Sequence, residues 1–249
     1  MNKTSSAYIV GFAALICIVC SLILSVVSGS LAEQQQKNRV VDQQKNILLA
    51  TGITPKMLGK MSSEDVTKTY GTKIKEMVIG RDGKIVEGKT IANLDKKVAV
   101  GEDINAEFLP IYQEMNDKGE AASFIYPVTG KGLWSTLYGY LAVRPNGDDV
   151  VGIAFYKHGE TPGLGAEIEK SWFTENFKGK KLYSDGKFVG VEVVKGKVAD
   201  KVGIDIAHAV DGISGATITG NGVGKMMQKK PKLYEPFFKN NMAVKGASL

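Results

Sequence analysis

An uncharged, strongly apolar stretch lies near the start of the chain. No charged residue falls between Ala7 and Ala32, and aliphatic side chains dominate this range. A helix needs about 20 apolar residues to cross the hydrocarbon core of a bilayer. The pattern therefore predicts one uncleaved transmembrane helix over about 8–31, within an anchor of residues 1–32. A cleaved signal peptide is the alternative, because Ser30-Leu31-Ala32 resembles a cleavage site, but its apolar core is only about 7–15 residues long.

A polar, helix-like pattern follows the apolar stretch. Between Glu33 and Ala50 there is neither Gly nor Pro, and apolar residues recur at near-helical spacing. Gly52 comes directly after this pattern, where a helix commonly ends. We expect residues 33–70 to form a helical stalk, or a first helix that packs on the body that follows.

Strand-like and Gly-rich segments fill the predicted soluble part, residues 71–249. Strands are expected over 72–98, around a turn at 81–84, and over 122–128, 138–143, 150–156 and 189–194. Helices are expected over 167–177 and over 221–230, where Pro231 ends the second, and the acidic stretch 100–120 is expected to be loop or short helix. Strands and helices mix without a regular βαβ rhythm. The predicted fold is therefore α+β: a single domain with a mixed or antiparallel sheet and flanking helices, its core at about 121–230.

Composition and charge narrow the functional classes only slightly. A hydrophobic content of 43% and a charged content of 23% are typical of a folded protein. The net charge of +6 is best explained by solvated lysines, with attraction to acidic lipid or to an acidic redox partner as the alternative. No nucleic-acid recognition motif is present, so no nucleic-acid partner is expected. Cys17 and Cys20 lie inside the apolar stretch and are interpreted as packing residues.

The Gly-rich stretch 211–222 carries the clearest chemical signal. Its side chains are short, several carry hydroxyls, and it leads into the last predicted helix. Glycines let backbone N–H groups approach a ligand closely, and a helix start offers unpaired N–H groups at the positive end of the helix dipole. The stretch therefore predicts an anion site, of which phosphate is the usual occupant. A threonine hydroxyl at this place would stand beside the phosphorus, as phosphoester formation requires.

Two other interpretations of this stretch stay open on spacing alone. It can be an ordinary Gly-rich loop in which Ser214, Thr217 and Thr219 cap the helix or form turns. It is also close to a G-x-S-x-G nucleophile elbow, with Ser214 as the nucleophile and His158 or His208 as its base.

Three ordered motifs resemble those of the FMN-binding domain family. Residues 211–217, D-G-I-S-G-A-T, resemble its flavinylation motif D-x-x-S/T-G-A-T. In that family the last threonine, here Thr217, accepts FMN phosphate from FAD through a Mg-dependent flavin transferase. Residues 160–165 resemble the E-T-P-G-L-G loop that lies against the flavin ring, and residues 130–135 resemble the G-x-G-L-W segment. Together with the single predicted span, the chain resembles the C subunits of Na+-translocating NADH:quinone oxidoreductases over nearly its full length.

The resemblance implies an electron carrier with FMN bonded covalently to Thr217. Leu164 would pack on the flavin ring, and Trp134 would stack or form a wall of the pocket, with a core tryptophan as the alternative. Thr219 is the nearest rival acceptor. No catalytic residue and no metal ligand is expected. The implied cofactor-binding residues are Thr217, Ser214, Gly215, Ala216, Asp211, Thr161, Gly163, Leu164, Glu160 and Trp134.

The same resemblance implies partners and a location. The partners are other membrane subunits that carry flavin and iron–sulfur centres, the flavin transferase during maturation, and membrane lipid. Their complex couples NADH oxidation and quinone reduction to Na+ translocation; this chain has no dinucleotide fingerprint and is not expected to bind NADH. The implied location is the bacterial inner membrane, crossed once, with the soluble domain in the periplasm, although Lys3 on one flank and Glu33, Lys37 and Arg39 on the other do not settle the orientation. Two rivals remain: the G subunit of the related Rnf complex, and a membrane-tethered flavin-binding sensory or scaffolding module.

Overall fold

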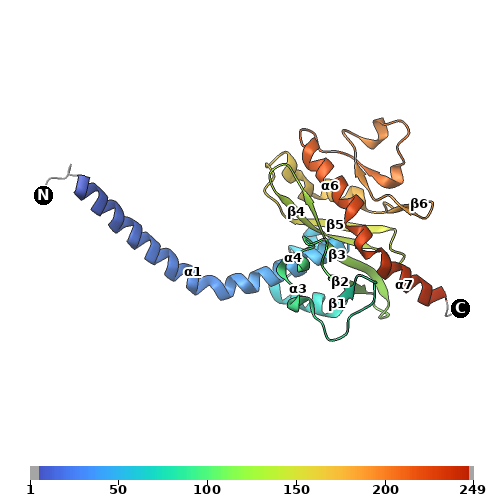
Figure 1. Ribbon diagram of the computed structural model, residues 1–249, viewed down its shortest axis with the longest axis horizontal. Helices are drawn as coiled ribbons and strands as arrows, with labels where there is room; N and C mark the ends of the chain where they lie inside the picture. Colours follow the sequence, from blue (N-terminus) through green and yellow to red (C-terminus); the bar gives the residue numbers. More distant parts are fainter. Residues whose placement is uncertain (1–5, 247–249) are drawn as a thin grey trace. The chain divides into compact units, whose positions relative to one another are not determined.

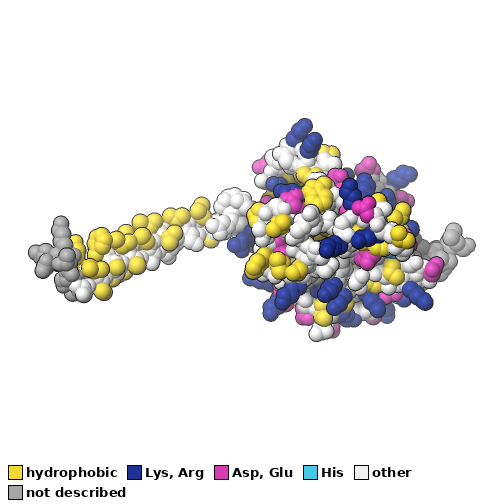
Figure 2. Space-filling view, turned by 90° about the horizontal axis from the view of Figure 1, so that it is seen from above, with side chains coloured by type: hydrophobic (Ala, Val, Ile, Leu, Met, Phe, Trp, Pro, Cys, Tyr) yellow, Lys and Arg dark blue, Asp and Glu magenta, His cyan; other side chains and the backbone are white. Residues whose placement is uncertain are grey.

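A long N-terminal helix precedes the compact part of the chain. A computed structural model describes residues 6–246 and divides the chain into two units, one up to Gln43 and one from Gln44 onward. Helix α1 (Ser6–Ala50) runs through the first unit and ends in the second, so the predicted span and the helix after it are one continuous helix. Its apolar stretch has a mean hydropathy of 2.9 and is long enough to cross a membrane. In Figure 2, hydrophobic side chains cover this stretch, and no charged side chain is seen on it.

The second unit is built on an antiparallel sheet of five strands. They follow one another as neighbours in chain order, so each strand pairs with the next one along the chain (Figure 1). The predicted α+β class is confirmed, with an antiparallel main sheet. The strands are β1 (Ile74–Gly80), β2 (Phe108–Met115), β3 (Ala121–Lys131), β4 (Thr136–Val143) and β5 (Val150–Lys157).

Strand β2 corrects the sequence analysis, which expected loop or short helix over 100–120. The strand pairs with β1 on one side and β3 on the other, and Leu109 and Ile111 are buried. Acidic residues and Pro110 mask the strand pattern in the sequence. The strand is stabilised by pairing along both of its edges, a contribution that local composition does not reveal.

Both faces of the sheet are covered. On one face, Tyr126 of β3 and Leu141 of β4 belong to the same hydrophobic core as Val223 of helix α6 (Thr217–Lys229). On the other face the end of α1 reaches β5 so closely that a Cβ on Gly152 would lie 2.7 Å from the Ala50 carbonyl oxygen. Small residues therefore allow the close contacts on this side.

Helix α6 begins earlier than the sequence predicts. The expected start at residue 221 is wrong: the helix begins at Thr217 and lies against β3 and β8 (Glu192–Val193). After Pro231 the chain continues through η6 (Pro231–Tyr234) and α7 (Glu235–Gly246). Because Thr217 is the first helical residue, the helix start coincides with the Gly-rich stretch.

The remaining elements are short and differ in part from the predictions. The helix expected over 167–177 consists of three short turns, and the strand expected over 189–194 shrinks to two residues that pair in parallel with β9. Beyond β1, the strands expected over 72–98 amount to one bridge between Ile79 and Ile85. These elements are α2 (Pro55–Leu58), α3 (Ser63–Lys73), η1 (Ile91–Asn93), α4 (Lys96–Ala99), η2 (Gly165–Glu169), α5 (Ser171–Thr174), η3 (Glu175–Phe177), β6 (Tyr183–Ser184), β7 (Lys187–Phe188), β8 (Glu192–Val193), η4 (Val198–Asp200), η5 (Ile206–His208) and β9 (Ala209–Val210).

Candidate functional site

The carboxylate of Glu160 connects the three motifs. One oxygen, Oε1, accepts hydrogen bonds from the N–H groups of Trp134 (3.0 Å) and Ser135 (3.1 Å). The other, Oε2, accepts from the N–H of Leu133 (3.0 Å) and from the Thr219 hydroxyl (2.5 Å). The residue is only 5% exposed. Glu160 thus ties the 130–135 loop and the first turn of α6 to its own loop.

These hydrogen bonds determine the protonation of Glu160. Burial alone would raise its pKa. The bonds from Thr219 and from the N–H groups of Trp134, Leu133 and Ser135 outweigh burial and hold the pKa below its ordinary value. Glu160 is therefore an anion whose carboxylate is satisfied by hydrogen-bond donors of the protein itself.

Glycines on each loop allow this close assembly. A Cβ on Gly132 would lie 2.6 Å from Glu160 Oε1, and one on Gly165 would lie 2.6 Å from Thr219 Oγ1. On α6, a Cβ on Gly222 would lie 2.2 Å from the Lys131 carbonyl oxygen. Any side chain at these positions would push the loops and the helix apart.

The E-T-P-G-L-G loop also contacts the flavinylation motif directly. Thr161 accepts backbone hydrogen bonds from Leu164 and Ala166, and Gly163 has a positive φ of 74°, which gives the expected tight turn. The turn presents Leu164, which is 42% exposed, so that its Cδ2 lies 2.8 Å from where a Cβ on Gly215 would stand. Gly215 also has a positive φ of 74°. The positive φ therefore favours glycine at this position, and a Cβ there would also displace the end of the Leu164 side chain.

The first turn of α6 is suited to an anion. Its N-cap residue, Ala216, is buried and has no side-chain hydrogen bond to the helix. Thr217, the first helical residue, is exposed, as are Ser214 and Gly215 before it. First-turn N–H groups without a capping side chain attract negative charge. An exposed hydroxyl thus lies where a phosphate group would bind.

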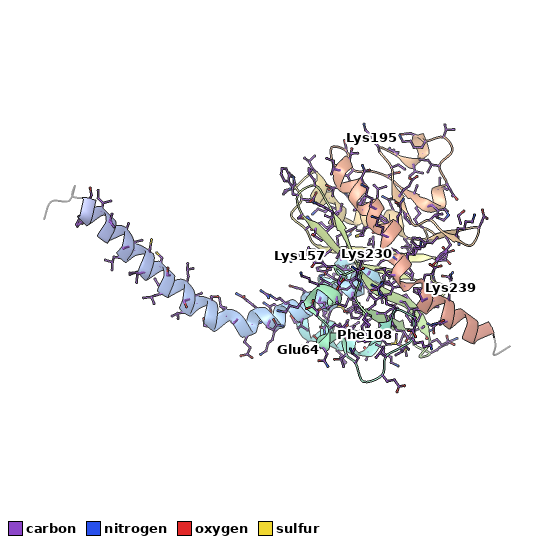
Figure 3. The ribbon with its side chains drawn as sticks, in the orientation of Figure 1. Glu64, Phe108, Lys157, Lys195, Lys230 and Lys239 are labelled. Atoms are coloured by element: carbon purple, nitrogen blue, oxygen red, sulfur yellow. The ribbon has the colours of Figure 1, made fainter. Side chains whose placement is uncertain are left out.

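Asp211 holds the start of the motif in place. Its Oδ1 accepts a hydrogen bond of 2.7 Å from the Val198 N–H, and the neighbouring Gly212 N–H donates to the Gly196 carbonyl oxygen (2.8 Å). The resemblance to FMN-binding domains implied that Asp211 is a cofactor-binding residue. This contact favours positioning of the loop. Lys195, labelled in Figure 3, directly precedes Gly196, whose carbonyl oxygen accepts the hydrogen bond from Gly212.

The rival acceptor and the hydrolase interpretation fit the geometry less well. Thr219 is 2% exposed and its hydroxyl already donates to Glu160. His158 accepts from the Glu160 N–H through Nδ1, and His208 Nδ1 lies 2.8 Å from the Lys181 carbonyl oxygen. Among the residues described, no hydrogen bond links either histidine to Ser214. The geometry therefore gives no support to a Ser-His pair.

Exposed apolar side chains surround the start of α6. Trp134 is 71% exposed, which excludes a core tryptophan, and Leu133 and Ile218 are 47% and 58% exposed. Isolated exposed apolar residues are common, but here Leu133, Trp134 and Leu164 come from two of the motifs, and Ile218 directly follows the third. An apolar planar ring and an anion could be held together at this place. Across residues 6–246 no group of three or more His, Cys, Asp or Glu could hold a metal ion.

The pair of Glu160 and Thr219 is the part of the site that the sequence analysis missed. Its members lie 59 residues apart, so no local spacing signals them. The glycine-rich character of residues 130–132 and 220–224 was the only available hint of the close approach.

Comparisons with known proteins match the part of the chain that contains these motifs. The FMN-binding domain family matches residues 132–230, which contain all three motifs except the first two residues of the G-x-G-L-W segment. The C subunit of a Na(+)-translocating NADH-quinone reductase from Yersinia pestis is 34% identical over 226 residues, covering 84% of this chain and 82% of the relative. The corresponding protein from Pseudomonas aeruginosa is 30% identical over 243 residues and 91% of both chains.

A solved structure gives the same relationship. The crystal structure of the C subunit of the Na(+)-translocating NADH-quinone reductase from Parabacteroides distasonis matches with a TM-score of 0.70 at 33% identity. The match covers 84% of this chain and 96% of that chain. The similarity therefore extends over almost the whole of the solved structure.

Proposed function

Since this chain belongs to the family of C subunits of Na(+)-translocating NADH-quinone reductases, we propose that it carries FMN on the Thr217 hydroxyl and passes electrons within such a complex. The chain contains an FMN-binding domain. The proposal adds the covalent bond, its acceptor residue and the electron-carrier role. A flavin supplies redox chemistry that no amino-acid side chain offers, and the protein supplies position and electrostatics.

The single observation that carries the proposal is the position of Thr217. Its exposed hydroxyl lies at the uncapped start of a 13-residue helix, beside the loop that presents Leu164. The helix start would hold the phosphate, and Leu164 and Trp134 would contact the ring. Thr219, by contrast, is buried and bonded to Glu160. Ser214, Gly215, Ala216, Asp211, Thr161 and Gly163 would shape the loops around the phosphate and ring.

The attachment step balances without an oxidant or a reductant. The Thr217 oxygen forms a bond to the FMN phosphorus of FAD, the bond from that phosphorus to the AMP moiety breaks, and the hydroxyl proton leaves. AMP is the leaving group. A Mg-dependent flavin transferase would supply the metal and bind FAD, because this chain's described residues offer no metal site.

The complex supplies the rest of the function. We propose that this protein exchanges electrons with membrane subunits that carry flavin and iron–sulfur centres, in a machine that couples NADH oxidation and quinone reduction to Na+ translocation. The apolar stretch of α1 would anchor it in the bacterial inner membrane as a single span, with the soluble unit in the periplasm. No carboxylate lies in that stretch, so this chain is not expected to form the ion path by itself.

A denaturing gel tests the covalent bond. Co-expression with a flavin transferase is expected to give a band that fluoresces under ultraviolet light, and Thr217→Val is expected to abolish it because no hydroxyl remains. Thr217→Ser, which keeps a hydroxyl, serves as the matched control. Thr219→Val tests the rival: if it abolishes the fluorescence while Thr217→Val keeps it, the acceptor assignment is wrong.

The G subunit of the Rnf complex remains the second candidate. The motif and anchor alone do not separate the two, but the long segment before residue 120 and the G-x-G-L-W segment favour the quinone reductase. Purifying the complex and comparing NADH-driven with ferredoxin-driven activity distinguishes them. A flavin-binding sensory or scaffolding module would instead be indicated by a reduction potential outside the respiratory range.

A further inference from the structure

A groove with basic sides begins beside Thr217. It has a volume of about 510 Å³ and lies between the end of β3 and the outer face of α6. Ile218, the residue after Thr217, lies in its wall, and Lys225 and Lys229 follow along the same helix. Ile104, Lys131 and Lys230 also line the groove.

The positive charges of this groove are not neutralised by the chain. Lys131, Lys225 and Lys229 are all exposed, and none of them takes part in the ion pairs found among residues 6–246. Lys181, by comparison, pairs with both Asp148 and Asp149. Uncompensated lysines around a concave surface attract an acidic partner.

Two carboxylates, those of Glu102 and Asp103, act electrostatically on Lys230, which also lines the groove. Glu102 accepts a hydrogen bond from the Tyr138 hydroxyl, and Asp103 accepts one from the Asn105 N–H at 2.8 Å. Neither lines the groove. The buried amine of Lys230, labelled in Figure 3, donates to the carbonyl oxygens of Gly101 and Glu102, which fastens this loop to the end of α6. The groove wall is thus held in place from within.

Exposed apolar side chains also line the groove. Ile104 and Ile218 are 55% and 58% exposed. Trp134, exposed at 71%, extends from the neighbouring loop. Specific protein–protein interfaces combine an apolar centre, often with an aromatic residue, and a polar rim. The pattern here fits a protein partner with an acidic rim.

We propose that this groove is the surface on which the redox partner of this protein docks, through an acidic protein face that matches Lys131, Lys225 and Lys229. The inference rests on the proposed function. Electron exchange weakens steeply with distance, so a partner must approach close to the FMN that Thr217 would carry. The groove begins at Ile218, the residue after Thr217. Its exposed lysines give this side of α6 a positive charge that an acidic partner would complement.

Charge reversal in the assembled complex tests the surface. In membranes that contain the full chain, Lys225→Glu with Lys229→Glu is expected to slow NADH-driven quinone reduction about tenfold at low ionic strength, with flavin fluorescence retained. Raising the salt concentration should narrow the difference from wild type, because the Debye length falls to about 8 Å at 0.15 M.

Lys75→Glu with Lys118→Glu is the matched control. Both lysines are exposed, and Lys118 lies in the turn before β3, at the opposite end of that strand from Lys131. Eleven residues at about 3.3 Å each separate the two ends by on the order of 35 Å. The control carries the same change of charge and is expected to keep wild-type activity and salt dependence.

Zero-length cross-linking identifies the occupant. A carbodiimide is expected to join Lys225 or Lys229 to an Asp or Glu of a redox partner. Lys225→Arg with Lys229→Arg is expected to remove this adduct, because the guanidinium group has no reactive amine. The docking proposal is overturned if Lys225→Glu with Lys229→Glu keeps its flavin fluorescence and supports quinone reduction as fast as wild type at every ionic strength. This holds even if the binding of the variant to acidic vesicles falls. A wild-type chain without fluorescence would instead mean that the proposed function itself has failed.

Discussion

Glu160 illustrates how one side chain organises the site. It was expected among the cofactor-binding residues, yet its carboxylate already accepts four hydrogen bonds from the protein. We infer that it positions the loops that would hold FMN, while direct contact with the cofactor stays a prediction. The sequence motif placed Glu160 at the site, but only the fold reveals Thr219, 59 residues away, as its partner.

Replacement of Glu160 by glutamine is expected to destabilise the soluble unit. The glutamine side chain has nearly the same shape as that of glutamate but carries no charge. Its NH2 group would face backbone N–H groups that now donate to the carboxylate. Hydrogen bonds to charged groups contribute about 1.5–3 kcal/mol, so a loss of about 2–4 kcal/mol in the free energy of unfolding is expected. Urea denaturation of the chain from residue 33 onward measures it. Glu169→Gln, at a half-exposed carboxylate, is the control and should cost less than about 1 kcal/mol.

The stability contributed by Glu160 also depends on pH. Its pKa is lower in the folded protein than the ordinary value of 4.5, because the hydrogen bonds outweigh burial. The unfolded chain therefore binds the proton more readily, and the contribution is complete above pH 4.5 and is lost as the pH falls through the folded pKa. The difference in unfolding free energy between wild type and Glu160→Gln should narrow below this pH. Parallel pH curves for the two proteins would contradict this account.

At the scale of elements, helix α6 brings the motifs together. Its glycines allow close packing on both sides: Gly222 faces β3, and Gly220 and Gly224 face Val193 of β8. Strands β3, β4 and β5 could be predicted because apolar runs are bounded by turn residues. The first turn of α6 could not, since Thr217 to Gly220 contains weak helix formers and the turn is stabilised by tertiary packing instead.

Gly222→Ala is expected to move α6 away from β3. The new Cβ would lie 2.2 Å from the Lys131 carbonyl oxygen, a backbone atom that cannot turn aside. Overpacking of this kind costs about 1–3 kcal/mol of unfolding free energy. Gly71→Ala in α3 is the control, because nothing lies within 4 Å of its Cβ position, and a gain of about 0.5–1 kcal/mol is expected there. Equal effects of the two substitutions on the urea midpoint would refute the packing explanation.

On the scale of the whole molecule, α1 contains residues of both units. Its apolar stretch is exposed, whereas Ile47 and Leu48 near its end are fully buried in the second unit. The sequence pattern predicted a helix over the apolar stretch and a polar helix after it, and α1 contains both stretches up to Ala50. Their continuity could not be predicted, because the change of pattern near residue 33 resembles a boundary between elements.

Two truncations separate anchoring from folding. Removal of residues 1–32 is expected to release the protein from the membrane fraction while its unfolding midpoint stays unchanged, since the apolar stretch is exposed. Removal of residues 1–50 also deletes Ile47 and Leu48, each of which contributes about 1.5–3 kcal/mol by burial. Sedimentation after carbonate extraction and thermal unfolding measure the two effects. If the protein without residues 1–32 stays in the membrane fraction, the proposal that this segment is the anchor is wrong.

The mass of the intact chain tests the central claim most directly. Extracted from membranes of a host that contains a flavin transferase, the protein should exceed its polypeptide mass by one FMN less one water, and fragmentation should locate the addition at Thr217. Thr217→Val should have the mass of the polypeptide alone. A wild-type chain without the addition, or an addition that persists in Thr217→Val, would contradict the account.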